Sequence, residues 1–502
     1  MKWRWYKSIR LNDISWWINI NSSPNEIDDK QGLECINFNF KWNNLVTAKW
    51  MTKLYDIWSW YVQWLKVIWG DIYHIAWWNV YKNWVKINTT GTLPYTWVVN
   101  FDIFEDYILF ADWTGLLPPR YLLDWTISLV WSTSLTNTKT NLWAKTVIVY
   151  NGKSVWWWMY KDTIVYSKTA SASTPALIID FNAYSAGIQS VWWQMSWAIV
   201  WFALWENGLY VFKENAIYYS NSEKDTGSDN PSAPTFSFIF NKITTSWTLS
   251  QQSIWNYKQE IFYYDNLSWW VRRLWYEQNL TTLKDTAISE DIQEIFNRLP
   301  KAQPNATISV SYPNLKLFLH SENSSINDVC LVYNLDNKAW AIEDNKICSI
   351  SFWWYLGSPY SNIIYKDDNT YWIDWITKTG IYLSKQYSMW DNIDYKRFWE
   401  IELSWSISAW ITAKIEILSD WEIIWEWEIV WTDTFYSTLW TTTLWTMPTD
   451  NNILSTSAFT KKIDLFNEWQ YIQYRITTNW AWIFELSNVN ILYKFINNFT
   501  IY

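Results

Sequence analysis

Side chains that could act in acid–base catalysis are few in this 502-residue chain. Histidine is the side chain whose charge changes near neutral pH, and the chain holds two, His74 and His320. His74 lies inside a predicted strand without a serine or cysteine nucleophile motif, so we expect a structural role. The paired acids at 28–29 and 290–291 have the pattern of solvated residues, and no aspartate box of the sialidase type occurs. We therefore expect no catalytic residue and no enzymatic activity.

Two short motifs resemble ligand sites but lack a required residue. Residues 151–154, Asn-Gly-Lys-Ser, resemble the end of a phosphate-binding loop, but that loop needs a glycine where this chain has Val147. Residues 367–369 resemble the start of a calcium loop, whose third ligand position holds Tyr371, an unsuitable ligand. We predict a hairpin turn at 151–154 and no metal or cofactor site.

The three cysteines are odd in number and match no metal-binding spacing. A free cysteine in a reducing compartment commonly behaves as a small hydrophobic side chain. We expect buried, unpaired thiols at Cys35, Cys330 and Cys348.

Composition and charge narrow the class of protein further. Hydrophobic residues make up 50% of the chain and charged residues 17%, which excludes a disordered chain. The formal net charge of −9 argues against a surface built for tight nucleic-acid binding, which normally carries a basic patch. Residues 1–10 are basic, but the apolar stretch of a secretory signal peptide does not follow. The longest apolar runs, such as 198–205, are too short to span a bilayer.

The proportions of tryptophan and glycine are the most unusual feature of the sequence. The chain holds 49 Trp and 10 Gly, whereas glycine is ordinarily about 7% of a protein and tryptophan is rare. Together the two residue types make up about 12% of the chain, which would be a normal glycine content for a glycine-rich β protein. Many tryptophans therefore occupy positions at which glycine would be expected.

The local contexts of these tryptophans are those of hairpin turns. Type I′ turns need positive φ at both central residues, so Asn-Gly and Asp-Gly are their strongest signals, and tryptophan there has a steric penalty that glycine avoids. Six tryptophans directly follow Asn or Asp, five doublets occur, and one triplet is present. The six are Trp84, Trp113, Trp125, Trp375, Trp421 and Trp480; the doublets lie at 16–17, 77–78, 192–193, 269–270 and 353–354, and the triplet at 156–158.

We infer that most of the tryptophans stand where the native protein has glycine, because UGA codons that specify glycine were translated as tryptophan. The abundance of Ile, Asn, Lys and Tyr fits an AT-rich genome. The alternative is a genuine tryptophan-rich protein with aromatic ligand platforms. The glycine interpretation predicts exposed or strained turn positions at Trp84 and Trp421, and extended or helical backbone there would contradict it. It also implies that pockets walled by clustered tryptophans are artefacts.

Strand patterns dominate the first four fifths of the chain. A pair of strands with a turn in its middle recurs at intervals of roughly 35–55 residues, for example at 107–110, 209–212 and 261–264. Repeats of this length are typical of propeller blades. We predict an all-β fold with a β-propeller of six or seven blades over 46–398, preceded by an N-terminal segment, 1–45, that closes the propeller.

One segment has a helical pattern. Apolar residues follow Ile292 at i+3, i+4 and i+7, Ser289 is a plausible N-cap, and Pro300 ends the pattern. We predict one short helix over 290–299, which either covers a blade or forms an oligomer contact. Two polar stretches, 131–143 and 221–235, are predicted loop insertions.

The pattern changes after residue 398. Hydrophobic residues occupy every second position from Ile401 to Ile417, which indicates a long half-buried strand or a hairpin through Trp405 and Trp410. We predict a separate antiparallel β-sandwich over 399–502. Its other expected features are a turn at 420–421 and strands at 471–476 and 488–495.

With tryptophan read as glycine, the chain resembles the tail stabilisation and tail-nozzle proteins of short-tailed bacteriophages, also called tail tubular protein B. The likeness covers most of the chain as a pattern of phrases, without one diagnostic motif. The most specific phrase is 209–219, and another, 333–340, ends in Trp340, which we expect to be a genuine tryptophan. Further phrases lie at 15–19, 21–25, 35–38, 288–292 and 391–398.

The resemblance implies a structural protein of the virion tail, assembled in the host cytoplasm, without cofactor or membrane insertion. It implies a homo-oligomeric ring, a hexamer, that contacts neighbouring tail and head–tail adaptor proteins and lets DNA pass without sequence-specific binding. A net charge of −9 is compatible with a conduit that does not bind its cargo. Two alternatives remain: a carbohydrate-binding β-propeller or adhesin with exposed tryptophan platforms, and a propeller hydrolase with acids that converge on a central pocket.

Overall fold

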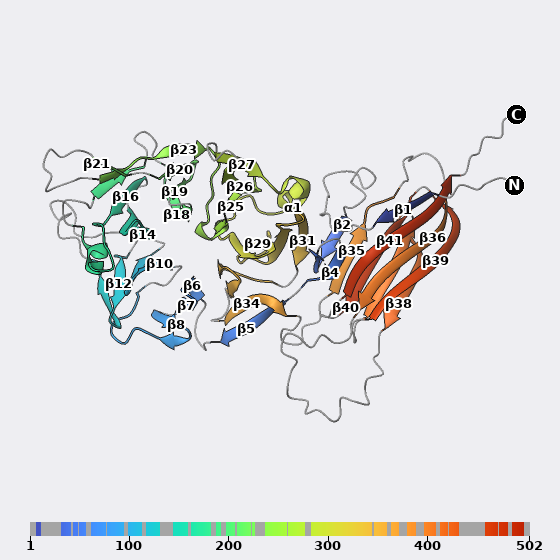
Figure 1. Ribbon diagram of the computed structural model, residues 1–502, viewed down its shortest axis with the longest axis horizontal. Helices are drawn as coiled ribbons and strands as arrows, with labels where there is room; N and C mark the ends of the chain where they lie inside the picture. The colour runs from blue at the N-terminus through green and yellow to red at the C-terminus, as the bar shows by residue number, and fades with distance from the viewer. Residues whose placement is uncertain are drawn as a thin grey trace, which may run out of the picture.

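The computed structural model is almost all β, with one short α-helix in the residues it describes (Figure 1). The described residues are 7–11, 32–41, 44–48, 50–56, 62–76, 78–94, 99–112, 117–130, 144–158, 162–181, 187–191, 197–205, 208–221, 223–225, 236–258, 260–276, 283–343, 346–358, 363–370, 379–387, 396–407, 412–419, 421–430, 457–469, 471–479 and 484–495.

Seven four-stranded antiparallel units form a β-propeller within these described ranges (Figure 1). Blade 1 contains β6 (Val62–Ile68), β7 (Asp71–Ala76), β8 (Asn79–Lys82) and β9 (Val85–Lys86). Blade 2 contains β10 (Val99–Phe104), β11 (Tyr107–Asp112), β12 (Arg120–Leu123) and β13 (Thr126–Leu129). Blade 3 contains β14 (Ala144–Tyr150), β15 (Lys153–Trp158), β16 (Thr163–Tyr166) and β17 (Gly187–Ser190). Blade 4 contains β18 (Ile199–Trp205), β19 (Gly208–Lys213), β20 (Ala216–Ser220) and β23 (Asn241–Thr244). Blade 5 contains β24 (Ile254–Tyr257), β25 (Glu260–Asp265), β26 (Trp270–Tyr276) and β27 (Leu283–Ala287). Blade 6 contains β28 (Thr307–Ser311), β29 (Asn314–Leu319), β30 (Val329–Asn334) and β31 (Ala339–Glu343). Blade 7 is β32 (Ile350–Phe352), β33 (Tyr355–Gly357), β34 (Ile363–Thr370) and β5 (Trp50–Asp56).

The first strand of each blade forms the inner wall of the ring. These inner strands contact one another in the order β6, β10, β14, β18, β24, β28 and β32, and β32 contacts β6 again, so the ring is closed. Hydrophobic clusters lie between neighbouring blades, where Phe101 and Phe110 of blade 2 pack with Ile75 and Val80 of blade 1. Each blade thus buries its faces against its neighbours. The predicted propeller is confirmed, with seven blades.

Closure of the ring differs from the sequence-based expectation. The strand that completes blade 7 is β5, which pairs with β34, and it lies just after the segment 1–45. The strands of that segment, β1 (Lys7–Leu11), β3 (Phe38–Lys41) and β4 (Asn44–Thr47), instead join the sheet of the C-terminal strand β41 (Phe484–Phe495). The prediction fails because the apolar side chains Phe38 and Leu45 are completely buried in the core shared with that sheet.

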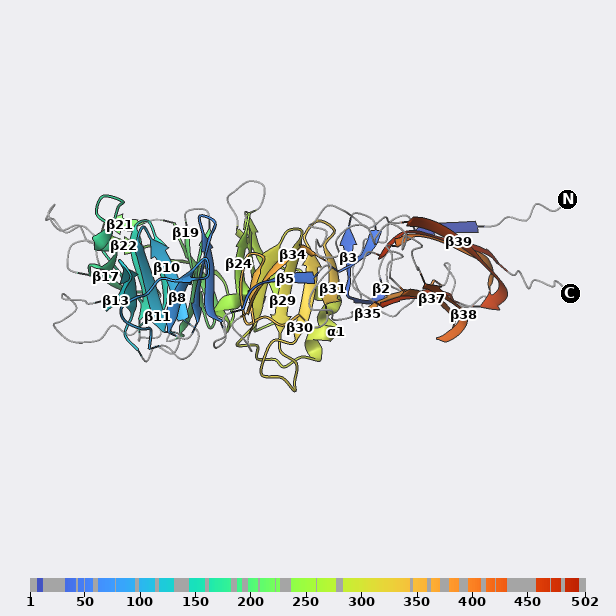
Figure 2. The same ribbon diagram turned by 90° about the horizontal axis from the view of Figure 1, so that it is seen from below.

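The C-terminal part of the chain forms two facing sheets, seen on edge in Figure 2. One sheet has the order β3-β4-β41-β36-β39, with β1 also paired to β41. The other contains β2-β35-β40-β37-β38. The strands not yet bounded are β2 (Gly32–Ile36), β35 (Thr379–Ser384), β36 (Lys396–Ile407), β37 (Thr412–Ser419), β38 (Glu422–Val430), β39 (Ser457–Trp469) and β40 (Gln473–Asn479).

The period-2 pattern after residue 398 places alternate side chains in the core of this sandwich. Ile401 and Leu403 of β36 and Ala413 and Ile415 of β37 are all fully buried in one cluster. However, β36 and β37 belong to different sheets, so they do not pair with each other as a hairpin. Residues 408–411, which include Trp410, lie outside the described residues.

The sandwich is not separate from the propeller. Strand β2 pairs with β35 of the sandwich and, through Ile36 and Ile342, with β31 of blade 6. One nine-stranded sheet therefore runs from blade 6 into the sandwich. The prediction of a separate sandwich from residue 399 does not match this sheet, because β2 pairs with strands of both parts.

The predicted helix over 290–299 is present in a shorter form. A 3₁₀ turn, η4 (Glu290–Ile292), leads into α1 (Gln293–Asn297). Ile292 and Phe296 are buried, as the spacing predicts. Ser289 does not cap the turn with its side chain; its hydroxyl accepts a hydrogen bond from the Val271 N–H at 2.9 Å. The helix lies over the core shared by blades 5 and 6, where Phe296 stacks on Tyr264 of blade 5.

The predicted loop insertions are partly described. In the stretch 221–235, β21 (Glu223–Asp225) pairs with β22 (Phe236–Phe238) as a small ribbon, and the Phe238 N–H donates to the Gln189 side chain of blade 3 at 2.8 Å. The stretch 131–143 lies outside the described residues. Two further 3₁₀ turns are η2 (Pro175–Ile179) and η3 (Gln251–Ser253).

Seven described tryptophans have left-handed backbone. Trp84 (φ 74°) and Trp421 (φ 70°), the two test positions, are among them. At both, the neighbouring strands are two residues apart, as in a tight hairpin. The prediction of turn backbone at these positions is confirmed. The other five are Trp69, Trp78, Trp125, Trp269 and Trp353.

A genuine Asn-Gly turn in the same chain has the same backbone. Asn151–Gly152, between β14 and β15, has φ values of 48° and 69°. Asn83–Trp84 has 45° and 74°, and Asp124–Trp125 has 46° and 65°. These are the type I′ values that asparagine and aspartate tolerate and that otherwise favour glycine.

The tryptophan triplet does not follow this rule. Trp156 and Trp157 lie inside β15, paired with strands on both sides, and not at a turn. Trp156 is completely buried, and its indole N–H donates to Ser154 Oγ at 2.8 Å. Reading the triplet as a turn was therefore wrong, because the turn lies at 151–152.

Candidate functional site

A hollow among the described residues lies on the propeller axis. It has a volume of about 320 Å³ and is lined by the inner strands of six blades. The lining residues are Trp64, Leu65, Lys66, Asn100, Phe101, Asp102, Val147, Ile148, Trp201–Leu204, Gln251, Gln252, Ile254, Trp255, Asn256, Ser351, Phe352 and Trp353. We call it the axial cavity. Such a volume suits one small molecule.

Polar side chains on the cavity wall connect neighbouring blades. Lys66 of blade 1 forms an ion pair with Asp102 of blade 2. Asp102 also accepts a hydrogen bond from the Val149 N–H of blade 3 at 2.8 Å. Asn100 accepts one from the Val147 N–H at 2.7 Å. These side chains hold the inner strands in register, and their charges cancel.

Aromatic rings fill much of the remaining wall. Trp64 of blade 1 and Trp201 of blade 4 meet across the axis, with ring centroids 5.6 Å apart. Trp255 of blade 5 contacts Phe352 of blade 7 edge-on at 5.3 Å. Contacts between non-adjacent blades show that these side chains narrow the central space. Glycine at positions 64, 201 and 255 would widen it.

Two residues on the cavity wall, Gln251 and Asn256, carry an amide oxygen that has no hydrogen-bond partner among the described residues. Gln251 is 5% exposed. Asn256 uses its Nδ2 to donate to the Leu204 carbonyl, which fixes the orientation of its amide. Both oxygens are shielded from solvent, so they belong to the packing around the cavity and not to its open space.

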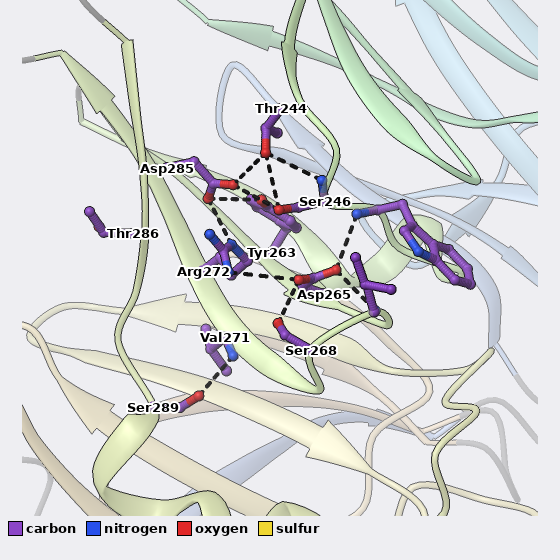
Figure 3. A network of polar contacts seen from close by, with 12 residues as sticks. Thr244, Ser246, Tyr263, Asp265, Ser268, Val271, Arg272, Asp285, Thr286 and Ser289 are labelled. Carbon is purple, nitrogen blue, oxygen red and sulfur yellow. Dashed lines mark hydrogen bonds and ion pairs between the residues drawn. The ribbon is translucent and has the colours of Figure 1, made fainter.

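A second polar group lies at the junction of blades 4 and 5 (Figure 3). The Asp285 carboxylate accepts four hydrogen bonds, at 2.8–2.9 Å. Asp265, 1% exposed, accepts from the Ser268 hydroxyl at 2.6 Å and from two backbone N–H groups. Every carboxylate oxygen is occupied by the protein itself, so the network is structural. The four donors to Asp285 are Thr244, Ser246, Tyr263 and Arg272.

A cluster of four charged side chains is buried where blades 6 and 7 meet the sandwich. We call Lys316, Glu343, Lys346 and Asp367 the junction cluster, and all four side chains are at most 5% exposed. Lys316 Nζ lies 3.1 Å from Glu343 and 2.7 Å from Asp367, and Lys346 Nζ lies 2.5 Å and 3.3 Å from the same two carboxylates. Asn39 of β3 donates to Glu343 at 3.1 Å.

Electrostatics within the junction cluster keep Lys316 charged. Burial alone would lower the pKa of Lys316, but Asp367 and Glu343 outweigh burial and raise that pKa above its ordinary value. Two cations and two anions leave no net charge. The cluster is therefore a satisfied structural network that links both blades to strand β3.

The sequence motifs considered for chemistry are placed apart from one another. His74 is completely buried in β7, and burial lowers its pKa to about 3, so it remains neutral. Residues 151–154 form the predicted hairpin turn. Asp367 belongs to the junction cluster and not to a calcium loop. In the described part of the chain, no group of three or more His, Cys, Asp or Glu could hold a metal ion. No helix there is long and apolar enough to cross a membrane.

The predicted burial of the three cysteines is confirmed, and it fixes their reactivity. All are completely buried and unpaired, and burial raises the pKa of the Cys330 thiol to about 12.

We expect native protein at pH 8 to show no fast reaction with a disulfide reagent, because the thiolate is the reactive form. Absorbance of the released thiol measures this, and three thiols should titrate after denaturation. A rapidly labelled thiol in the native state would contradict the prediction. The three are Cys35, Cys330 and Cys348.

Comparison with known proteins identifies no family. No family model and no curated protein matches the chain. Among solved structures, it is similar to the extracellular domain of a putative one-component system from B. thetaiotaomicron, at 10% identity and a TM-score of 0.38, over 69% of this chain and 43% of that one. It is also similar to the Cps50 (Swd1) β-propeller domain of Myceliophteria thermophila, at 6% identity and a TM-score of 0.38, over 63% and 98%. A third is PorZ, a surface component of the type-IX secretion system of Porphyromonas gingivalis, at 10% identity and a TM-score of 0.30, over 69% and 44%. The chain thus spans less than half of the first structure.

Proposed function

We propose that this chain is a structural protein of a bacteriophage tail, which assembles as a ring around the path of the DNA. The sequence phrases that resemble tail-nozzle proteins support this function, and the propeller with an attached sandwich is compatible with it. The carboxylates of the network around Asp285 and of the junction cluster are held by the protein's own side chains, which favours scaffolding over catalysis at these two places. Because the axial cavity is sized for a small molecule, DNA would pass through a ring of copies and not through one propeller.

We also propose that most tryptophans are glycine in the native protein. The observation that carries this proposal is the backbone match between Asn151–Gly152 and the turns at 83–84 and 124–125. Left-handed backbone costs a non-glycine residue about 1–2 kcal/mol, and a chain that repeats this arrangement at seven tryptophans is better suited to glycine at those positions.

Mass spectrometry of the protein from its natural source should find glycine at most tryptophan positions. Peptides that cover Trp84 and Trp125 should each be lighter by the mass difference between the two residues, whereas the peptide with Trp340 should keep tryptophan. Trp340 is 1% exposed, and its indole N–H donates to the Ile288 carbonyl at 2.9 Å, as expected of a genuine tryptophan. Peptide masses that retain tryptophan at positions 77 and 78 would refute the recoding.

Ring assembly gives a test that does not depend on the genetic code. The glycine form of the chain, alone or with adjacent tail proteins, should elute as a closed oligomer, with six copies expected from the resemblance. Light scattering gives the copy number, and negative-stain images show the ring. A chain that stays monomeric in both conditions would contradict the tail-ring proposal while leaving the glycine proposal intact.

The carbohydrate-binding adhesin is the alternative proposal. Its expected feature, exposed tryptophan platforms, corresponds to Trp69, Trp125 and Trp421 at separate hairpin turns, which are 99%, 53% and 58% exposed. Trp353 and Trp354 are also exposed, and their ring centroids lie 5.8 Å apart. Glycan-array signals that disappear with Trp69→Gly would favour the adhesin.

A further inference from the structure

We infer that Asn151 is a site of spontaneous covalent modification, at which the side-chain amide is lost through a succinimide ring. Asn83, in a turn of the same geometry, is protected from this reaction. The inference goes beyond the tail-ring proposal and does not depend on it. It starts from Asn151–Gly152, where the glycine stands in the sequence itself. Because glycine has no Cβ, its backbone nitrogen can approach the side chain of the preceding asparagine closely.

The reaction joins the two residues of the turn. The Gly152 backbone nitrogen loses its proton to a solvent base and bonds to Asn151 Cγ, while the bond from Cγ to Nδ2 breaks and the amide leaves as ammonia. Water then opens the ring at one of its two carbonyl carbons. Opening at the carbonyl from the backbone gives isoaspartate, and opening at the carbonyl from the side chain gives aspartate. Overall, an amide and water become a carboxylate and ammonium.

Both reacting groups are free in the turn at 151–152. The Asn151 side chain is exposed and makes no hydrogen bond within the described part of the chain. The Gly152 N–H likewise donates to no described acceptor, whereas the Gly152 carbonyl accepts from the Ala170 N–H at 2.6 Å. The Asn151 amide can therefore turn toward the Gly152 nitrogen without losing a side-chain hydrogen bond.

Asn83 has the same kind of turn but a held side chain. Its φ of 45° is close to the 48° of Asn151, and both residues are exposed. However, Asn83 Oδ1 accepts from the Ile72 N–H at 2.9 Å, and Nδ2 donates to Asp71 Oδ1 at 2.6 Å. The amide must leave these partners before its Cγ can be attacked. The loss of two hydrogen bonds, one of them to a carboxylate, should make Asn83 react at least about tenfold more slowly than Asn151.

Isoaspartate at position 151 should also loosen a neighbouring segment. It leads the chain through the former side chain, which lengthens the backbone of a two-residue turn. Gly152 has no space to move inward, because even a Cβ there would lie 2.4 Å from the Ala170 carbonyl oxygen. The lengthened turn must therefore move outward and lose the hydrogen bond from the Ala170 N–H. Hydrogen exchange at Ala170 should be faster in the modified protein.

The test uses the full chain with Trp84→Gly, so that both turns carry Asn-Gly. The folded protein is kept in mildly alkaline buffer, and peptide mass spectrometry follows the conversion of each asparagine, with isoaspartate separated by chromatography. We expect Asn151 to convert at least about tenfold faster than Asn83. A parallel sample in urea is the matched control, because both sites should convert at similar rates once the turns are unfolded.

Asp71→Ala removes the acceptor of Asn83 Nδ2, and it should speed conversion at Asn83 severalfold. Circular dichroism and a melting curve verify that this variant is folded. Equal rates at the two sites in folded protein would overturn the inference. So would an Asn151 that stays unconverted while the urea sample reacts, or a rate at Asn83 that Asp71→Ala leaves unaltered.

Discussion

Replacing the seven left-handed tryptophans together by glycine should raise the free energy of unfolding by about 4–7 kcal/mol. Each substitution removes a steric penalty of about 1–2 kcal/mol, from which the greater freedom of glycine in the unfolded chain subtracts part. The sites lie at separate turns, so their effects should add. Urea unfolding followed by circular dichroism measures the change. The seven are Trp69, Trp78, Trp84, Trp125, Trp269, Trp353 and Trp421.

The control for this experiment is Trp340→Gly. Trp340 packs against Tyr333 with ring centroids 4.8 Å apart and is 1% exposed. Its removal leaves a large cavity and an unpaired Ile288 carbonyl, which should destabilise the protein by about 4–5 kcal/mol. Opposite signs at the turns and at Trp340 are the expected result. If the sevenfold variant is no more stable than the parent, the turns do not require glycine.

Lys346→Met should lower the free energy of unfolding by about 3–5 kcal/mol. The Lys346 side chain is completely buried between Glu343 and Asp367. Its loss leaves the two carboxylates with only Lys316, so the buried group acquires a net negative charge that water cannot reach. The urea midpoint of the variant measures the effect.

An exposed pair supplies the comparison for the junction cluster. Lys168 forms an ion pair with Asp180 at 2.8 Å, with both side chains about a quarter exposed. Lys168→Met should change stability by less than about 1 kcal/mol, because solvent screens the pair. Adding Glu343→Gln to Lys346→Met restores charge balance and should recover part of the loss. Equal effects of Lys346→Met and Lys168→Met would show that the junction cluster has no special role.

The propeller could be predicted from sequence because six of its seven blades are local. The strands of these blades follow one another along the chain, so spacing and turn signals such as Asn151–Gly152 report directly on the fold. The alternation from Ile401 to Ile417 likewise predicted which side chains are buried. Successive side chains of a strand lie on opposite faces of its sheet, whichever strand it pairs with. It did not reveal that β36 and β37 enter different sheets, because alternation does not name the partner strand.

The parts that sequence could not predict depend on distant pairings. Strand β5 completes blade 7 from more than 300 residues away, and β2 joins blade 6 to the sandwich through a single pair, Ile36 and Ile342. The axial cavity draws its walls from six blades, so Gln251 and Lys66 become neighbours of one space only after the ring has closed. No local motif marks such residues.

The order in which strands pair has a consequence for synthesis of the protein. Strand β5 can pair with β34 only after β34 has been synthesised. Likewise, β1 and β4 can pair with β41, the last strand of the described chain, only after it has been synthesised. At about 5–20 residues per second, this delay is on the order of a minute. During it, the early strands expose unpaired edges that invite wrong partners. A polypeptide released before residue 484 would lack the strand that binds its own beginning. Closure by late strands therefore distinguishes finished from unfinished copies before any assembly begins.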